Sequence, residues 1–321
     1  YGAALHYFTG SKAHNIAVRK LGIKKGYKIN EYGVFKGEKR IAGKTEKEVY
    51  ARIDLPFIPP ELRENRGELE LAHKNELPDL INLKDIRGDL HCHTRATDAK
   101  HSMQQMVKAA ARLGYDYLSI NDHSKHVTVA RGLDKKHLLE QIRKIDKLNE
   151  KLDKIVILKS VELNILEDGS LDLPDSVLEQ LDFTVCAVHY KFDLSRNKQT
   201  TRILRAMDNP YFNILAHPTG RIINEREPYS VDLEKIMRAA LDRGCFLEVN
   251  ARPERMDLTD DACKLAKDLG VKVAVSTDAH RIGDLDLMRF GVDQARRGWL
   301  EKDDVINAQP LKKLKSLLKR K

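Results

Sequence analysis

From about residue 85 onward, short apolar runs alternate with longer stretches of helical periodicity. The apolar runs have the length of buried strands, and we expect seven of them, ending near His93, Asn121, Glu162, Val188, Ala216, Asn250 and Thr277. The clearest amphipathic helices between them are expected at 102–113, 133–148, 231–243 and 260–269. Repeated strand-then-helix units predict an α/β fold with a parallel sheet, and polar residues at every strand end favour a closed barrel.

The pattern before residue 85 is different. Helical spacing at 11–20 and 45–53 flanks a predicted strand pair at 27–35, which turns near Gly33, so residues 1–60 read as a small α+β unit. A Pro-rich, charged stretch follows, and proline at this density stiffens a linker. We therefore expect three segments, with the α+β unit at 1–60, a linker at 61–84 and the barrel at 85–321.

Composition excludes some classes of protein. Hydrophobic residues make up 41% of the 321 positions, enough for a sizeable core. No apolar run approaches the roughly 18 residues that span a bilayer, so no membrane partner is expected. The cysteines are far apart in sequence and form no CxxC pair: Cys92, Cys186, Cys245 and Cys263. This spacing argues against a disulfide framework and a zinc ribbon, and favours a cytoplasmic protein with small buried cysteines.

Positive charge is concentrated near the two ends of the chain. Residues 1–60 hold 12 Lys/Arg against 5 Asp/Glu, and residues 311–321 add six basic residues and no acid. A basic segment of this kind favours a phosphate backbone as partner. On charge alone, a solvated basic surface without a ligand is an equally good interpretation.

Histidines and carboxylates gather at the predicted strand ends. His91 and His93 lie two residues apart in a strand, so they share a face, although an HxH pair alone is weak evidence. Seven further candidates occupy later strand ends or the loops that follow them: Asp98, His123, Glu162, His189, His217, Asp278 and His280. Because a barrel brings its strand ends to one rim, we expect these nine residues to form a multinuclear metal centre. Asp122, beside His123, is expected to support the ligands.

The histidine and carboxylate pattern resembles the PHP family, named for polymerase and histidinol phosphatase. The resemblance implies a distorted (β/α)₇ barrel that holds three divalent metal ions. It assigns His91, His93, Glu162 and Asp278 to the first ion, Glu162, His189 and His217 to the second, and Asp98, His123 and His280 to the third. Imidazole and carboxylate ligands suit Mn²⁺, Zn²⁺ or Fe²⁺, and the family's nucleases favour Mn²⁺. One departure is Ala99 where related sequences have glycine, which puts the shape of that loop in question.

Several side chains near the rim could hold substrate phosphates. These predicted substrate contacts are Arg131, Lys191, Arg221, Asn250 and Arg252. Arg221 is the best supported, because His217-Pro-Thr-Gly-Arg221 resembles the form found in PHP domains of family X DNA polymerases. We therefore add Arg221 to the catalytic set of His91, His93, Glu162 and Asp278. For each cation, a merely exposed side chain is an equally good interpretation.

The N-terminal unit carries a second resemblance. Leu5-His-Tyr-Phe-Thr-Gly-Ser11 is similar to the thumb motif of family X polymerases, which include DNA polymerase beta. The resemblance implies DNA or nucleotide contacts by Tyr7, Phe8, Gly10, Ser11, Asn15 and Arg19. The chain starts at Tyr1 and lacks an Asp-x-Asp pair before residue 60, so we expect the palm and fingers upstream and no polymerase activity from this chain.

Together these features predict the C-terminal part, thumb plus PHP domain, of a bacterial or archaeal family X DNA polymerase. The expected activity is a Mn²⁺-dependent 3′–5′ exonuclease on gapped or single-stranded DNA 3′ ends in repair, with abasic-site or 3′-phosphate cleavage as extensions. One alternative is a small-molecule phosphomonoesterase of the histidinol-phosphatase type. Another is a PHP domain that only scaffolds a polymerase, although such domains tend to lose ligands and this chain has all nine.

Overall fold

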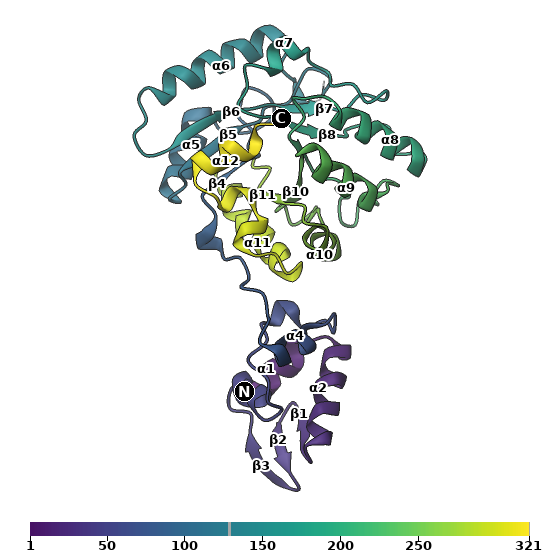
Figure 1. The fold of residues 1–321 in the computed structure, drawn as a ribbon. Helices are drawn as coiled ribbons and strands as arrows, with labels where there is room; N and C mark the ends of the chain where they lie inside the picture. The colour runs from purple at the N-terminus through teal and green to yellow at the C-terminus, as the bar shows by residue number, and fades with distance from the viewer. Residues whose placement is uncertain (128–129, 321) are drawn as a thin grey trace. The chain divides into compact units, whose positions relative to one another are not determined.

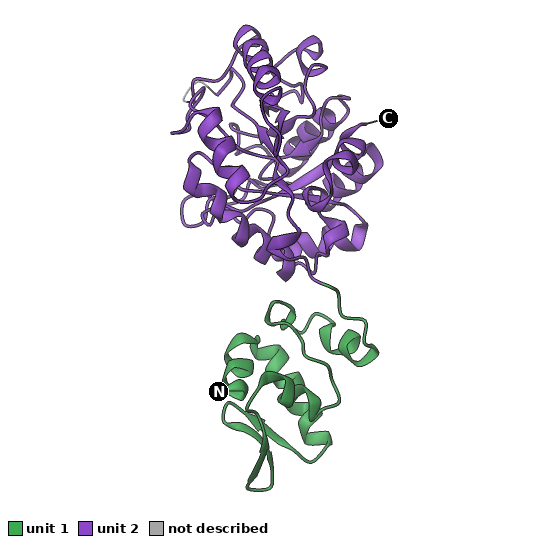
Figure 2. Cartoon of the chain, turned by 90° about the vertical axis from the view of Figure 1, so that its left-hand side faces the viewer, with its two compact units in different colours: residues 1–79 green, residues 80–321 purple. Residues whose placement is uncertain are grey.

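The chain forms two compact units, residues 1–79 and residues 80–321 (Figure 2). The structure is a computed structural model that describes residues 1–127 and 130–320. Over these described ranges, no helix is both long and apolar enough to cross a membrane. Each unit buries hydrophobic side chains of its own.

The first unit is a small α+β domain built on a three-stranded antiparallel sheet of order β1-β2-β3. Its elements are α1 (Gly2–Thr9), α2 (Lys12–Lys24), β1 (Lys28–Asn30), β2 (Gly33–Lys36), β3 (Lys39–Ala42), α3 (Glu46–Ala51) and α4 (Glu68–Lys74). The hydroxyls of Ser11 and Thr45 accept backbone N–H groups at the starts of α2 and α3, which explains where these helices begin. The α+β prediction is confirmed, while α1 and β3 were not predicted.

Residues 61–79 pack as part of this unit, whereas the sequence suggested a linker from residue 61. Arg63 is fully buried and donates hydrogen bonds to the Ile58 carbonyl, the Thr9 hydroxyl and the Glu46 carboxylate. Glu68, also buried, lies 2.6 Å from Nδ1 of His14. A buried charge is stable only with such partners, so these two residues tie the segment to the domain. The linker prediction rested on the proline content of this segment, which gives no sign of these long-range contacts.

The second unit alternates parallel strands with helices (Figure 1). The strands are β4 (Gly88–Asp89), β5 (Tyr117–Ile120), β6 (Val156–Lys159), β7 (Glu162–Asn164), β8 (Val185–Ala187), β9 (Ile214–Leu215), β10 (Phe246–Asn250) and β11 (Val273–Ser276). The helices are α5 (Met103–Arg112), α6 (Lys135–Asn149), α7 (Asp175–Leu178), α8 (Arg196–Met207), α9 (Leu233–Arg243), α10 (Asp260–Leu269), α11 (Met288–Arg297) and α12 (Leu311–Leu318). The predicted α/β class and barrel are confirmed.

The strands form two sheets, β4-β5-β6 and β11-β10-β9-β8-β7, and single parallel bridges join them into a ring. His123 pairs with Glu162 at one junction, and Cys92 pairs with Ala279 at the other. β6 and β7 are two parts of the third predicted strand, which is interrupted at residues 160–161. Glu162 therefore begins β7, whereas the sequence suggested that this residue ends a strand.

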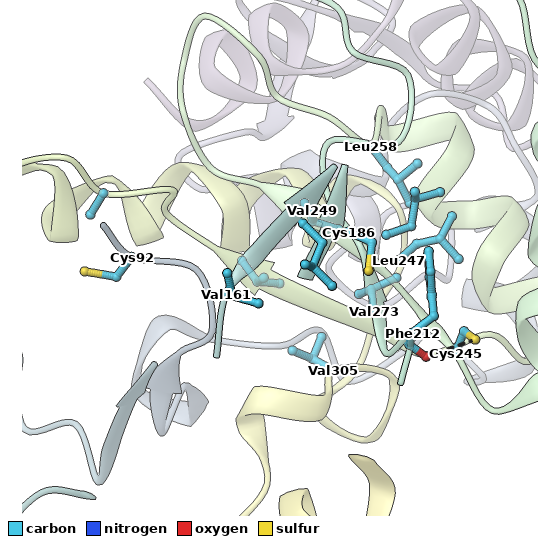
Figure 3. Close-up of a cluster of buried hydrophobic side chains, with 14 of the residues drawn as sticks. Cys92, Val161, Cys186, Phe212, Cys245, Leu247, Val249, Leu258, Val273 and Val305 are labelled. Carbon is cyan, nitrogen blue, oxygen red and sulfur yellow. Dashed lines mark hydrogen bonds between the residues drawn. The ribbon is translucent and has the colours of Figure 1, made fainter. Parts of the chain in front are cut away.

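Side chains alternate between the two faces of the barrel wall. Tyr117, Leu158 and Phe246 belong to the cluster that fills the barrel, and Leu314 and Leu318 of α12 close one end of it. Leu247 and Val249 of β10 face the other way and pack in the layer between strands and helices (Figure 3). This period of two is what orients the polar residues at the strand ends toward the barrel axis.

Asn307 joins β4 to β11 where their backbones do not pair. Its side-chain amide donates to the carbonyls of Gly88 and Val275 at 2.8 Å each, and its oxygen accepts the N–H of Val275 at 3.0 Å. Asp89 strengthens the same seam, since its carboxylate accepts the N–H and hydroxyl of Thr277. Because Asn307 is fully buried, water cannot replace these bonds.

We expect Asn307→Ala to lower the free energy of unfolding by about 3 kcal/mol, since it leaves buried backbone groups without partners. Urea unfolding followed by the fluorescence of Trp299, the one tryptophan in the sequence, measures this change. Asn197→Ala, at an exposed position of α8, is the matched control and should shift stability by less than about 0.5 kcal/mol. Equal midpoints for the two variants would contradict the role of Asn307.

Candidate metal centre

The nine predicted ligands converge at the C-terminal ends of the barrel strands. His91 and His93 follow β4 and are both fully buried, and their Nε2 atoms lie 3.1 Å apart. The hydrogen bond from the His91 backbone N–H to the Asp89 carboxylate fixes the start of this segment. The two ring nitrogens thus point to one place, as the HxH spacing predicted.

The carboxylate of Glu162 lies in the middle of the cluster. Its Oε1 is 3.1 Å from the Nε2 atoms of both His189 and His217. Its Oε2 is 2.9 Å from Nδ1 of His123 and 3.5 Å from Nε2 of His91. The two oxygens therefore face different histidines, which is the arrangement of a carboxylate that can bridge two cations.

Two aspartates complete the set. Asp278 Oδ1 lies 3.2 Å from Nε2 of His93. Asp98 Oδ2 lies 3.3 Å from Nε2 of His123 and 3.4 Å from Nε2 of His280. Three groups have donor atoms within 4.8 Å of one another: His91, His93 and Asp278; His123, Glu162 and His189; and His93, Asp98, His123 and His280.

The protonation chemistry of these residues fits divalent cations. Burial and the charges of His280 and His123 lower the pKa of His93 to about 3, which leaves its imidazole neutral. Burial would raise the pKa of Glu162, but the surrounding imidazoles, led by His123, hold it well below its usual value. Burial likewise opposes charge on His123, yet Glu162 and Asp98 raise its pKa to about 10. A cation between these groups would replace that proton, because metal ligands must be deprotonated.

Two residues behind the ligands were missed by the sequence analysis. Glu248 Oε1 lies 2.7 Å from Nδ1 of His91, and its Oε2 accepts the backbone N–H of His217 at 2.8 Å. Asn164 Oδ1 lies 2.7 Å from Nδ1 of His189. Such partners fix the tautomer and direct Nε2 toward the centre. The alternation of side chains along β10 could have indicated Glu248, because this residue shares a face of the strand with Asn250.

Asn250 corrects one prediction. It is fully buried, and its amide donates to Glu248 at 3.1 Å and to Asp278 Oδ2 at 3.2 Å. Its oxygen accepts the N–H of Arg252. Both ends of the side chain are therefore occupied by protein, and Asn250 orients Asp278 instead of contacting substrate.

The backbone is strained at two of the predicted ligands. His217 and Asp278 have φ values of 29° and 52°, in a region that L-residues rarely adopt. Such conformations cost on the order of 1–3 kcal/mol each and persist where surrounding bonds enforce them. By contrast, Ala99 has no positive φ and is buried, so this loop does not need the glycine of related sequences.

The predicted phosphate-binding cations have unequal surroundings. Arg131 is exposed and donates to the carbonyl of Thr97 at 2.8 Å, next to Asp98. Arg252 donates to the carbonyl of Asp278 at 3.2 Å. Lys191 is also exposed. Arg131 and Arg252 thus both reach segments that carry predicted metal ligands.

Arg221 supports a loop of the barrel, and a phosphate contact by this residue stays a prediction. Its guanidinium donates to the carbonyls of Arg255 and Met256, so it holds the loop after β10. That loop presents Arg255, which the sequence analysis missed. Nε of Arg255 lies 3.7 Å from Asp278 Oδ2, and its Nη1 is buried with no hydrogen-bond partner among the described residues. Arg255 is therefore better placed than Arg221 to meet an anion at the centre.

The first unit exposes part of the predicted DNA-contacting set. Phe8 is 76% exposed and packs edge-on against Tyr7, with ring centroids 5.1 Å apart. The guanidinium of Arg19 lies over the Tyr7 ring at 5.1 Å. These three side chains form an aromatic and cationic surface of the kind that contacts bases and phosphates.

The remaining residues of that set support the turn between α1 and α2. The amide of Asn15 donates to the carbonyls of Tyr7 and Gly10 at 2.9 and 3.0 Å, and Asn15 is 8% exposed. Ser11 caps α2. Their amide and hydroxyl groups hold the backbone that carries Tyr7 and Phe8, and a direct DNA contact by these residues stays a prediction.

The fold and site together define a metal-dependent phosphoesterase barrel preceded by a polymerase-type thumb. The family model of the DNA polymerase beta thumb matches residues 4–64, and that of the PHP domain matches residues 89–252. The chain belongs to the PHP family and joins its barrel to the thumb of a family X DNA polymerase.

Two relatives in sequence, a polymerase and a probable phosphatase, agree with this assignment. The DNA polymerase/3′-5′ exonuclease PolX of Bacillus subtilis is 40% identical over 323 residues, which is 100% of this chain and 56% of that protein. The chain thus spans little more than half of that relative. A probable phosphatase of Thermoanaerobacter is 31% identical over 246 residues, covering 73% of this chain and 94% of that protein. The zinc-bound histidinol phosphate phosphatase of Lactococcus lactis has a TM-score of 0.47 and 18% identity, covering 65% of this chain and 93% of that one.

We expect Glu162→Gln to remove bound metal while the barrel stays folded, because the amide keeps the shape of the side chain but loses the negative charge shared between two groups of ligands. Elemental analysis of protein equilibrated with Mn²⁺ should show at least two ions fewer per chain. Glu167→Gln, at an exposed position beyond β7, should keep the full complement. An unchanged metal content in Glu162→Gln would rule out the bridging role.

Proposed function

We propose that this protein is a Mn²⁺-dependent 3′–5′ exonuclease that removes nucleotides from DNA 3′ ends during repair. The single observation that supports this most is the buried carboxylate of Glu162, with both oxygens facing separate groups of histidines. The thumb that accompanies the centre favours a nucleic acid over a metabolite, because a small substrate needs no DNA-binding unit.

The donor set suits three divalent ions. His91, His93, Glu162 and Asp278 would hold the first, Glu162, His189 and His217 the second, and Asp98, His123 and His280 the third. Bound cations of this kind lower the pKa of water toward neutrality and neutralise the charge of a phosphodiester. Nitrogen and oxygen donors in mixture favour Mn²⁺, with Zn²⁺ and Fe²⁺ as alternatives.

The protein supplies orientation and further positive charge. Arg255 lies beside the centre, with its Nε 3.7 Å from Asp278 Oδ2 and its buried Nη1 without a hydrogen-bond partner among the described residues, so it is suited to hold a non-bridging phosphate oxygen. Arg221 keeps that loop in place through two carbonyls. Arg252 adds a second cation close to the Asp278 backbone. A guanidinium that is already ordered loses little freedom when it binds phosphate.

Two alternatives to exonuclease activity can be weighed against the chain. A phosphomonoesterase on a small molecule would use the same ligands, and the Thermoanaerobacter relative is called a probable phosphatase. A PHP domain that only scaffolds a polymerase has no reason to keep a full donor set. We propose a cytoplasmic protein whose palm and fingers lie upstream of the thumb, and we expect no nucleotide polymerisation by residues 1–321 alone.

With Mn²⁺, the chain should release 5′-mononucleotides one at a time from a 3′-labelled oligonucleotide, as seen by chromatography of the products. Single-stranded or gapped ends should react faster than blunt duplex, because unpairing a terminal base costs free energy. Intact DNA together with phosphate release from small monoesters would support the histidinol-phosphatase type of activity instead.

Arginine variants refine the same assay. Arg255→Ala should lower kcat/KM by roughly 100-fold, which is about the loss from one charge-assisted contact to a developing anion, while metal content stays the same. Arg238→Ala, at an exposed position of α9 where it pairs with Glu234, is the matched control and should leave the rate unchanged. Equal rates for the two variants would exclude Arg255 from phosphate binding.

A further inference from the structure

A basic groove opens beside α6, close in sequence to the metal ligand His123. It encloses about 630 Å³, and its walls come from α6, from the segment after His123 and from the segment before α7. Its charged lining residues are Lys125, Asp134, Lys135, Lys136 and Arg143. Four of them are cations, and the metal centre described above does not use any of these side chains.

The positive charge of the groove is not neutralised by the protein. Its one acid, Asp134, caps α6 by accepting the backbone N–H of His137 at 2.9 Å, and its Oδ1 is also 2.8 Å from Nδ1 of that residue. Among the described residues, no carboxylate forms an ion pair with Lys125, Lys135 or Lys136, and the same holds for Arg143. Uncompensated cations in a concave surface attract an extended anion.

The first turn of α6 adds to the positive charge of the groove. Lys135 and Lys136 stand at its positive end, and no acid occupies that turn. By contrast, α10 begins with Asp260 and Asp261, which complement its dipole. Asp134 caps this end of α6, but the two lysines of the first turn outnumber its single negative charge.

The groove wall is fastened to the ligand segment. The N–H of Leu133 donates to the carbonyl of His123 at 2.7 Å, and Ser124 forms a parallel bridge with Leu133. A Cβ at Gly132 would lie 1.9 Å from the carbonyl oxygen of Ser124, so only glycine allows this approach. On the other wall, Asp172 accepts the Ser124 hydroxyl at 2.7 Å and directly precedes Leu173. Lys125 follows His123 by two residues, so their Cα atoms are at most about 7 Å apart.

We propose that this groove binds the phosphate backbone of the single DNA strand whose 3′ end enters the metal centre. The cations would pair with successive phosphates, and Leu139, Leu173 and Pro174 supply an apolar surface for sugars and bases. This inference rests on the proposed exonuclease function and adds the path of the substrate. It predicts that activity rises with strand length until the groove is filled.

The test compares Lys135→Ala/Lys136→Ala with Lys147→Ala/Lys151→Ala, which removes the same charge from exposed positions at and beyond the other end of α6, about 17 Å away along the helix. With Mn²⁺ and single-stranded oligonucleotides of increasing length, the groove variant should lose roughly tenfold in kcat/KM on long strands. The slope of log kcat/KM against log salt should fall by about 1.4, since each phosphate contact to a single strand contributes about 0.7. Hydrolysis of bis(p-nitrophenyl) phosphate, which is too short to reach the groove, should stay the same.

Binding of a fluorescein-labelled strand, measured by anisotropy with Ca²⁺ in place of Mn²⁺, separates this inference from the proposed function. If the unmodified chain cleaves the small ester but not DNA, the exonuclease proposal fails, while a tenfold weaker affinity of the groove variant still supports the groove. If both variants bind and cleave long strands equally well, the groove proposal is overturned whatever the activity of the centre.

Discussion

A carboxylate that is 1% exposed would normally be protonated, yet five imidazoles lie within 3.5 Å of the Glu162 oxygens and keep it ionised. The same burial that strengthens these attractions makes any unpaired charge costly. The cluster is therefore stable only when carboxylates, imidazoles and cations are in balance. This electrostatic constraint determines which residues can occupy the strand ends and explains why supporting acids such as Glu248 lie directly behind them.

The barrel meets this constraint by holding its strand ends rigidly. The third strand is interrupted at residues 160–161, and the pairing of Glu162 with His123 carries the wall across that break. At the opposite seam, Asn307 and Asp89 supply hydrogen bonds where β4 and β11 do not pair. Strained backbone at His217 and Asp278 is kept in place by the same network. The precise geometry of the centre thus depends on residues outside the set of nine predicted ligands.

The sequence predicted the parallel barrel. It also predicted that nine polar residues lie at one rim, because the C-terminal ends of parallel strands all lie on the same side of a barrel. The sequence did not predict features that depend on the direction in which a side chain points. The sequence predicts a substrate contact by Asn250, which is fully buried, and it gives no sign of Arg255, whose carbonyl is held by Arg221. The sequence predicts a linker at 61–84, but residues 61–79 belong to the first unit through two long-range partners, Glu46 for Arg63 and His14 for Glu68. Local pattern carries no information about such pairs.

In the proposed centre of three cations, Glu162 holds two of them at once. Crystals of the chain grown with Mn²⁺ and measured near the manganese absorption edge would locate each ion by its anomalous signal. We expect three peaks at the strand ends, with one oxygen of Glu162 directed to each of two of them and Asp98 beside the third. A single peak, or several peaks with Glu162 bound to none of them, would contradict it.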